Sequence, residues 1–196
     1  MDVRRVVGAS FAIFLAGTGL SATIYFSGRP VHFSDAVISN FLSPGDNPRG
    51  YFAAAVGVAI SGLVLVPTAL IFYRRMSAIH GWGSMIGTAF YGTGLLSAIL
   101  IGCVAPVRAL DFSVHLALAY AAFMSLQAGI LVYLAVTAYG AKSRRLTAFA
   151  GVNWVLAVVL FYLSFGPDWP GSTAFCEWAL CGTIAAGLWI LASWCN

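Results

Sequence analysis

Six long runs of apolar residues, separated by short polar segments, make up most of the chain. Each run reaches about 20 residues, the length that an α-helix needs to cross the hydrocarbon core of a bilayer. The apolar positions are continuous and do not alternate, which favours helices over the strands of a transmembrane barrel. The predicted helices cover about residues 6–26, 51–73, 82–104, 112–139, 146–165 and 172–194. The pattern therefore predicts an all-α, polytopic membrane protein, with residues 1–196 forming a single bundle of six transmembrane helices.

Composition supports this class. Hydrophobic residues make up 61% of the chain and charged residues 8%, whereas about a quarter of the residues of a soluble domain are charged. The surface of this protein must therefore face lipid. The first apolar run follows the basic start Met1–Arg5, as in a signal peptide, but it is long enough to span a membrane, and we interpret it as a retained first helix.

Basic residues set the predicted orientation. Seven of the ten fall on one side if the N-terminus is cytoplasmic, and an excess of Lys and Arg marks the cytoplasmic loops of membrane proteins. These seven are Arg4, Arg5, Arg74, Arg75, Lys142, Arg144 and Arg145. The sequence thus predicts an N-in, C-in topology and an integral, multi-pass protein of the plasma membrane, with the short loops favouring a bacterial inner membrane. Basic residues in such short clusters do not indicate nucleic-acid binding.

The longest polar segment, between Gly28 and Tyr51, falls on the outer side in this topology. Residues 32–43 have helical periodicity, with Ser34 as a candidate cap and Ser43-Pro44-Gly45 as a stop. We expect a short amphipathic helix in this first outer loop, with its apolar stripe on lipid or on the bundle top and its polar stripe toward the other outer loops. Loops of this length are usually functional or structured.

Nearly all side chains capable of acid–base or ligand chemistry gather on the same outer side. Two arginines there, Arg49 and Arg108, could hold a phosphate head group or pair with neighbouring aspartates. The candidate ligand-binding residues are His32, Asp35, Ser39, Arg49, Arg108, His115 and Glu177.

Two carboxylates on this side have specific candidate roles. Asp111 and His115 are four apart at the start of the fourth helix, so they share a face. The carboxylate could orient the imidazole as a general base or metal ligand, or Asp111 could simply cap the helix. Glu177 lies about one turn into the sixth helix, where a carboxylate needs a partner. We expect that partner to be Arg49, Arg108 or His115, in a structural ion pair or a catalytic site.

The histidines and carboxylates of this side could also form a metal site. His32, Asp35, Asp111 and His115 offer the nitrogen and oxygen ligands that zinc accepts. The spacing contains no HExxH motif, and we predict no cofactor, with zinc as the alternative. The four cysteines lack CxxC spacing, and only Cys103 and Cys176 fall near the same face, which leaves a disulfide between them open.

Two short motifs resemble the Frag/DRAM/Sfk family of six-helix membrane proteins. The segment AVISNFLSPGDNP places Ile38 and Ser39 before Pro44 and Pro48, and VHLALAYAAF places His115 before Phe123. The chain is similar as well to a bacterial six-helix family of unknown function. The family resemblance implies a role in lipid remodelling, lipid asymmetry or membrane trafficking.

These observations predict a membrane protein that binds or handles a lipid or other amphiphile through a polar site at the extracytoplasmic face. The alternative is an intramembrane, metal-assisted lipid hydrolase that uses His115 and Asp111, with Glu177 as a further catalytic candidate. A transporter ranks behind both, because charge in the middle of the membrane is nearly absent. The expected partners are membrane lipids or a small amphiphile, and homo-oligomerisation is left open.

Overall fold

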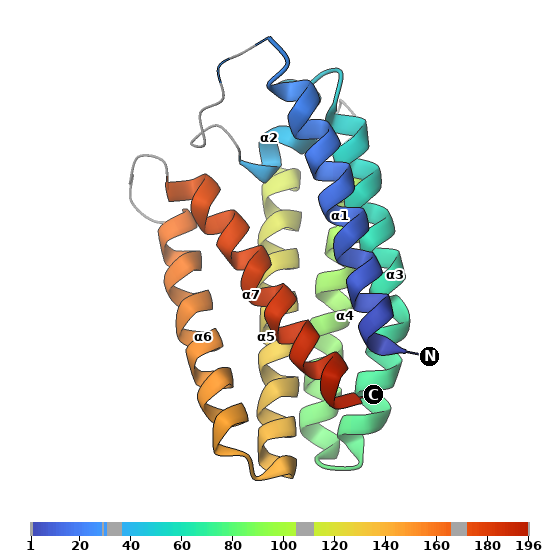
Figure 1. Cartoon of the computed structure of the whole chain (residues 1–196), viewed down its shortest axis with the longest axis vertical. Coiled ribbons are helices and arrows are strands. Elements are labelled where there is room, and N and C mark those ends of the chain that lie inside the picture. The colour runs from blue at the N-terminus through green and yellow to red at the C-terminus, as the bar shows by residue number, and fades with distance from the viewer. Residues whose placement is uncertain (1, 29, 31–36, 105–111, 166–171, 196) are drawn as a thin grey trace.

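The computed structural model describes residues 2–28, 30, 37–104, 112–165 and 172–195. Within these residues it contains seven α-helices and no strand (Figure 1). They are α1 (Val3–Tyr25), α2 (Ile38–Leu42), α3 (Tyr51–Ser77), α4 (Gly81–Val104), α5 (Phe112–Ala141), α6 (Arg144–Phe165) and α7 (Ser172–Cys195). The six long helices run side by side, and the short α2 lies across one end of the bundle.

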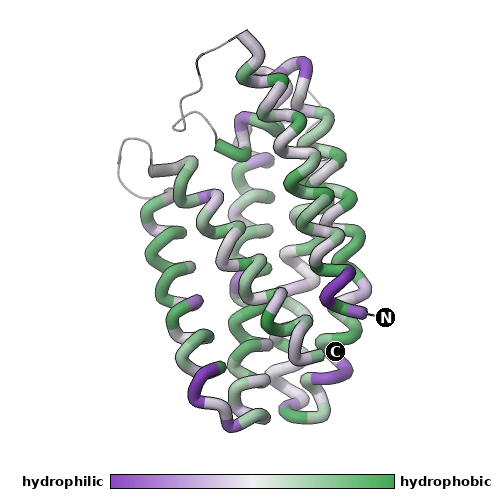
Figure 2. Tube along the Cα trace, viewed as in Figure 1, coloured by the Kyte–Doolittle hydropathy of each residue, from purple (hydrophilic) through white to green (hydrophobic). Residues whose placement is uncertain are grey.

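The six long helices of the described chain are each long and apolar enough to cross a membrane. Their apolar residues spread along the whole length of the bundle (Figure 2). The protein is therefore an integral, multi-pass membrane protein, as its sequence predicts. Three helices include basic residues beyond their apolar runs: α1 begins at Val3, ahead of Arg4 and Arg5, α3 continues through Arg74 and Arg75 to Ser77, and α6 already begins at Arg144. A helix can leave the bilayer without losing its backbone hydrogen bonds, and long arginine side chains reach water from such ends.

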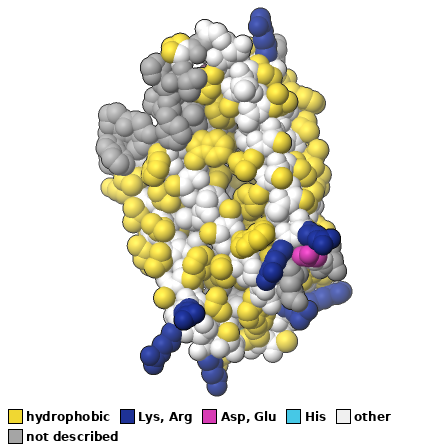
Figure 3. Space-filling model, in the orientation of Figure 1, with side chains coloured by type: hydrophobic (Ala, Val, Ile, Leu, Met, Phe, Trp, Pro, Cys, Tyr) yellow, Lys and Arg dark blue, Asp and Glu magenta, His cyan; other side chains and the backbone are white. Residues whose placement is uncertain are grey.

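The two ends of the bundle differ in charge. Both chain termini lie toward the same end (Figure 1), and Lys and Arg side chains surround it (Figure 3). All seven basic residues assigned to the cytoplasmic side are exposed there, and we call this the basic end. The opposite end, which carries α2 and the turn after it, is called the loop end. The even number of spans matches the predicted topology, and the assignment of the basic end to the cytoplasm stays a prediction.

Glycines let neighbouring helices approach closely. A Cβ atom added to Gly17 of α1 would lie 2.7 Å from the Cα of Gly57 on α3. On α4, a Cβ atom at Gly94 would lie 2.5 Å from the backbone nitrogen of Leu126 on α5. Small residues at such interfaces are a general means of bringing membrane helices together. Gly83 and Gly87 of α4 also face α5, where their neighbours are Val136 and Tyr133.

Three aromatic side chains fill the core toward the basic end. The rings of Phe72, Tyr91 and Tyr133 have centroids 5.5–6.1 Å apart and are all fully buried. The two tyrosine hydroxyls are hydrogen-bonded to threonines, with Thr68 2.9 Å from Tyr91 and Thr88 2.6 Å from Tyr133. A buried hydroxyl needs such a partner. These three rings and their threonine partners therefore form a closely packed part of the core.

A polar network joins the last three long helices in the middle of the bundle. The amide nitrogen of Gln127 donates to Oδ1 of Asn153 at 2.6 Å, and the amide of Asn153 donates to the carbonyl oxygen of Thr183 at 3.1 Å. The hydroxyl of Thr183 lies 3.3 Å from Oε1 of Gln127. Gln127 and Asn153 thus make the interhelical hydrogen bonds that amides inside apolar membrane helices need, and Thr183 completes the set.

Replacing Asn153 with leucine should therefore loosen α6, which packs only against α5 and α7 among its main contacts. The change leaves Gln127 and the Thr183 carbonyl without their partner, and such hydrogen bonds are worth about 1–2 kcal/mol each in membrane helices. We expect a lower free energy of unfolding in detergent by about that amount. Val155→Leu, at an exposed position of the same helix, serves as a control. Equal stability of Asn153→Leu and the wild type would contradict the assigned role.

Candidate functional site

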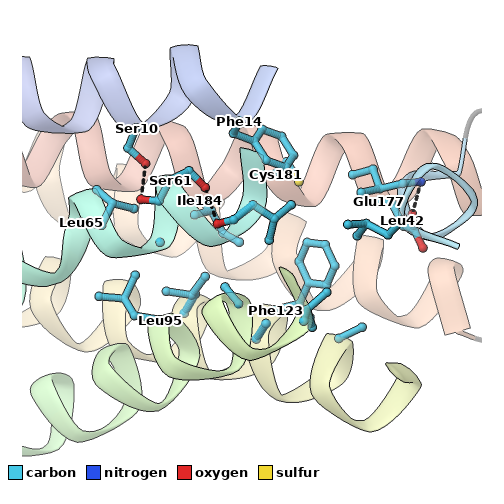
Figure 4. A pocket seen from close by; sticks show the side chains of 18 of the residues that line it. Ser10, Phe14, Leu42, Ser61, Leu65, Leu95, Phe123, Glu177, Cys181 and Ile184 are labelled. Carbon is cyan, nitrogen blue, oxygen red and sulfur yellow. Dashed lines mark hydrogen bonds between the residues drawn. The ribbon is translucent and has the colours of Figure 1, made fainter. Parts of the chain in front are cut away.

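A mostly apolar cavity of about 140 Å³ runs inside the bundle below α2 (Figure 4). Six helices contribute to its wall, and α6 contributes none of the lining residues. Glu177 and Leu188 of α7 both line the cavity, and at 1.5 Å of rise per residue they are about 16 Å apart along the helix. The apolar walls come mainly from Phe11, Phe14, Ile38, Leu42, Val58, Leu65, Leu95, Ile101, Phe123, Leu126, Ile184 and Leu188. A slot of this shape suits an apolar chain.

Polar side chains are concentrated at the loop end of this cavity. Glu177 of α7, His115 of α5 and Ser39 of α2 line it there, and Glu177 itself is buried. Ser10 and Ser61 lie deeper, where both hydroxyls are engaged with backbone carbonyls: Ser10 donates to Ser61 at 3.0 Å, and Ser61 donates to Val58 at 2.8 Å. The deep part therefore presents little free polarity, whereas the loop end presents a carboxylate, an imidazole and a hydroxyl.

The carboxylate of Glu177 holds the start of α2. Its Oε2 accepts a hydrogen bond of 2.9 Å from the backbone N–H of Ile38, and the carboxylate also accepts from the backbone N–H of Ser39. These are the first two N–H groups of α2, which have no partner within the helix. The residue before them, Val37, makes no side-chain cap. A carboxylate from α7 thus takes the place of an N-cap residue, and its negative charge faces the positive end of the helix.

The expected ion-pair partners of Glu177 are not observed among the described residues. Arg49 is exposed and does not line the cavity, and neither Arg49 nor His115 forms a salt bridge with Glu177. Arg108, the third expected partner, lies outside the described residues. The prediction of a partner for the carboxylate is correct, but the partners found are backbone N–H groups.

The other end of α2 is held by α1. The hydroxyl of Ser21 donates to the carbonyl oxygen of Phe41 at 2.9 Å. Asn47, in the turn after α2, donates from its side-chain amide to Ser21 Oγ at 2.8 Å and accepts from the backbone N–H of Gly50 at 3.0 Å. Both Ser21 and Asn47 are buried. Sequence analysis missed this pair, although Asn47 in a Pro-rich turn ahead of a helix is a typical position for an Asx-type backbone bond.

The observed α2 is shorter than the helix predicted over residues 32–43. It ends at Leu42, before Ser43-Pro44-Gly45 as expected, but it begins at Ile38 because Val37 has extended backbone angles. The proposed cap Ser34 lies outside the described residues. Ile38, Phe41 and Leu42 are buried, so the apolar face lies against the bundle. Ser39, expected to face the other outer loops, instead lines the cavity.

Of the predicted site residues, the structure brings together Ser39, His115 and Glu177 at the loop end of the cavity. Arg49 lies apart on the surface. His32, Asp35, Arg108 and Asp111 lie outside the described residues, so their ligand, catalytic and metal roles, including the Asp111–His115 pair, stay predictions.

No group of three or more metal-type side chains occurs among the described residues. The zinc set predicted from His32, Asp35, Asp111 and His115 depends mainly on residues that are not described. All four cysteines are free, so the disulfide between Cys103 and Cys176 is absent.

Comparisons with known proteins do not assign the chain to a family. No protein-family model, curated protein or solved structure matches the chain. The resemblance to the Frag/DRAM/Sfk family stays a prediction, carried by residues that include Ile38, Ser39 and His115, all three of which line the cavity.

Proposed function

We propose that this protein binds a membrane amphiphile, with the apolar tail in the cavity between the helices and the polar head near Glu177, His115 and Ser39. The observation that carries the proposal is the cavity itself, which is apolar along its length and polar at one end. Ligand sites in proteins commonly have this form, with apolar walls and a few placed polar groups.

The position of the polar end supports an amphiphile over a fully apolar ligand. The polar end lies at the loop end, where lipid head groups reside if the predicted topology holds, and the apolar part extends toward the middle of the membrane. The head and tail of a bound amphiphile would thus lie at the depths that they occupy in the bilayer. The resemblance to a family implicated in lipid remodelling agrees with this proposal.

Filling the cavity should abolish binding. Ala122 of α5 is buried and lines the cavity, so Ala122→Leu places a branched side chain in the space assigned to the tail. We expect at least about a tenfold loss of bound amphiphile, because a ligand chain and the new side chain cannot share the same volume. The measurement is native mass spectrometry of the purified protein, read as the amount of lipid-like adduct retained.

Ala117→Leu is the matched control, since Ala117 lies on the same helix, is exposed and does not line the cavity. It should retain the adduct at the wild-type level. Folding of both variants is checked by their thermal melting in the same detergent. Equal retention by well-folded Ala122→Leu and wild type would overturn the proposal that the tail occupies this cavity.

A further inference from the structure

We infer that the ligand is a single-chain amphiphile whose head group donates hydrogen bonds, with a primary ammonium bound best. This inference rests on the proposed function and names the class of ligand. It follows from two features of the cavity: the chemistry of its polar end and its narrow cross-section.

The polar end supplies acceptors. A carboxylate has about four lone-pair sites for hydrogen bonds, and the N–H groups of Ile38 and Ser39 account for two of those of Glu177. The side chain nevertheless lines the cavity, so acceptor capacity remains for a ligand there. No lysine or arginine is among the lining residues of the described chain. As far as the described residues line it, the cavity therefore lacks the cations that usually hold phosphate or carboxylate heads.

Charge favours an ammonium over a neutral donor. Within the described residues the buried Glu177 has no cationic partner, and in its ionised form two backbone N–H groups compensate the negative charge only in part. Hydrogen bonds to a charged group are about twice as strong as neutral ones. An ammonium would complete the pairing of this carboxylate, while an anionic head would meet like charge. This differs from the prediction of a phosphate site at Arg49 and Arg108, because Arg49 lies outside the cavity.

The dimensions of the cavity favour one chain. Its volume of about 140 Å³ is spread over much of the depth between Glu177 and Leu188. A dry cavity of about 150 Å³ holds one benzene-sized group. The observed volume therefore holds about six carbon atoms of one acyl or alkyl chain, and a second chain would have to displace the helix walls.

The test is a panel of alkyl probes added to wild-type protein in phosphatidylcholine nanodiscs, with binding read by native mass spectrometry. Hexylamine should bind more tightly than hexanol, and hexanoate should bind more weakly than both. Dihexylamine, a secondary amine with two chains, should bind at least about tenfold more weakly than N-methylhexylamine, a secondary amine with one chain, if the slot admits one chain.

Glu177→Gln tests the charge while keeping an acceptor oxygen for the N–H of Ile38. It should weaken hexylamine binding about tenfold or more and change hexanol binding much less, since hydrogen bonds to charged groups are the stronger ones. Asp46→Asn is the matched control, because Asp46 is an exposed carboxylate of the loop end that does not line the cavity. It should leave the affinity for hexylamine unchanged.

The outcomes separate this inference from the proposed function. If hexanoate binds best, if dihexylamine binds as tightly as N-methylhexylamine, or if Glu177→Gln leaves hexylamine affinity unchanged, the inferred ligand class is wrong while binding in the cavity stands. If no probe binds to the wild type, or if Ala122→Leu binds the probes as tightly as the wild type does, both the inference and the proposed function fail.

Discussion

Replacing Gly94 with alanine should lower the free energy of unfolding by about 3 kcal/mol, because the new methyl group would overlap the backbone of the neighbouring helix. Its Cβ would lie 2.5 Å from the backbone nitrogen and 2.9 Å from the Cα of Leu126 on the neighbouring helix. Backbone atoms cannot rotate away as a side chain can, so α4 and α5 must separate. The measurement is an unfolding titration of the purified protein in mixed micelles.

Gly92→Ala is the matched control, two residues away on the same helix. A Cβ atom there meets nothing within 4 Å, and alanine is a better helix former than glycine. This variant should be as stable as the wild type or more so. If Gly94→Ala were equally stable, α4 and α5 would have to be further apart than the structure places them.

The same close packing accounts for the form of the cavity. Glycines bring α1 close to α3 through Gly17 and Gly57, and α4 close to α5 through Gly94 and Gly129. The helices α1, α3, α4 and α5 therefore form a tight layer, and α7 lies across it (Figure 1). The cavity occupies the space that this layer, α7 and the short α2 leave between them. A wall fixed by glycine contacts cannot widen easily, which is why the cavity should discriminate between one chain and two.

The sequence predicted the spans well because membrane crossing leaves a strong local signal. Twenty successive apolar residues can be recognised without any knowledge of their neighbours in space. Each of the six long helices lies within a few residues of its predicted bounds. The end of α2 at Leu42 was likewise predicted from a local stop signal, Ser43-Pro44-Gly45. The interhelical hydrogen bonds of Gln127 and Asn153 can also be inferred from the local sequence, since an amide inside an apolar helix needs a partner.

The site was harder to predict because its contacts are distant in sequence. Glu177 and Ile38 are 139 residues apart, and nothing in either segment indicates that one caps the other. Sequence reasoning paired Glu177 with an arginine or with His115, because it considered only side chains as partners and overlooked the free N–H groups of a short helix. The residues of the cavity wall could not be identified from the sequence, because Leu65, Leu126 and Leu188 do not differ from other apolar residues of a membrane helix.

Glu177 connects the stability of α2 to the cavity, so its replacement has the second largest expected effect. Glu177→Leu removes the acceptor of two backbone N–H groups, and an unsatisfied buried donor costs about 1–3 kcal/mol. A five-residue helix cannot make up such a loss from its own hydrogen bonds. We therefore expect α2 to detach from the bundle in this variant, whereas the six long helices stay folded.

Thiol labelling detects this detachment. Leu42→Cys places a reporter at a position that is 5% exposed, in a Cys103→Ser background that removes the exposed native thiol. Labelling by a maleimide should be slow with Glu177 present and at least about tenfold faster with Glu177→Leu, since a loss of 1.4 kcal/mol is a factor of ten in an opening equilibrium. Glu177→Gln, which keeps an acceptor oxygen, should stay close to the slow rate. Equal protection in the leucine variant would mean that Ile38, Phe41 and Leu42 hold α2 by apolar packing alone, and that the carboxylate is free to serve the ligand entirely.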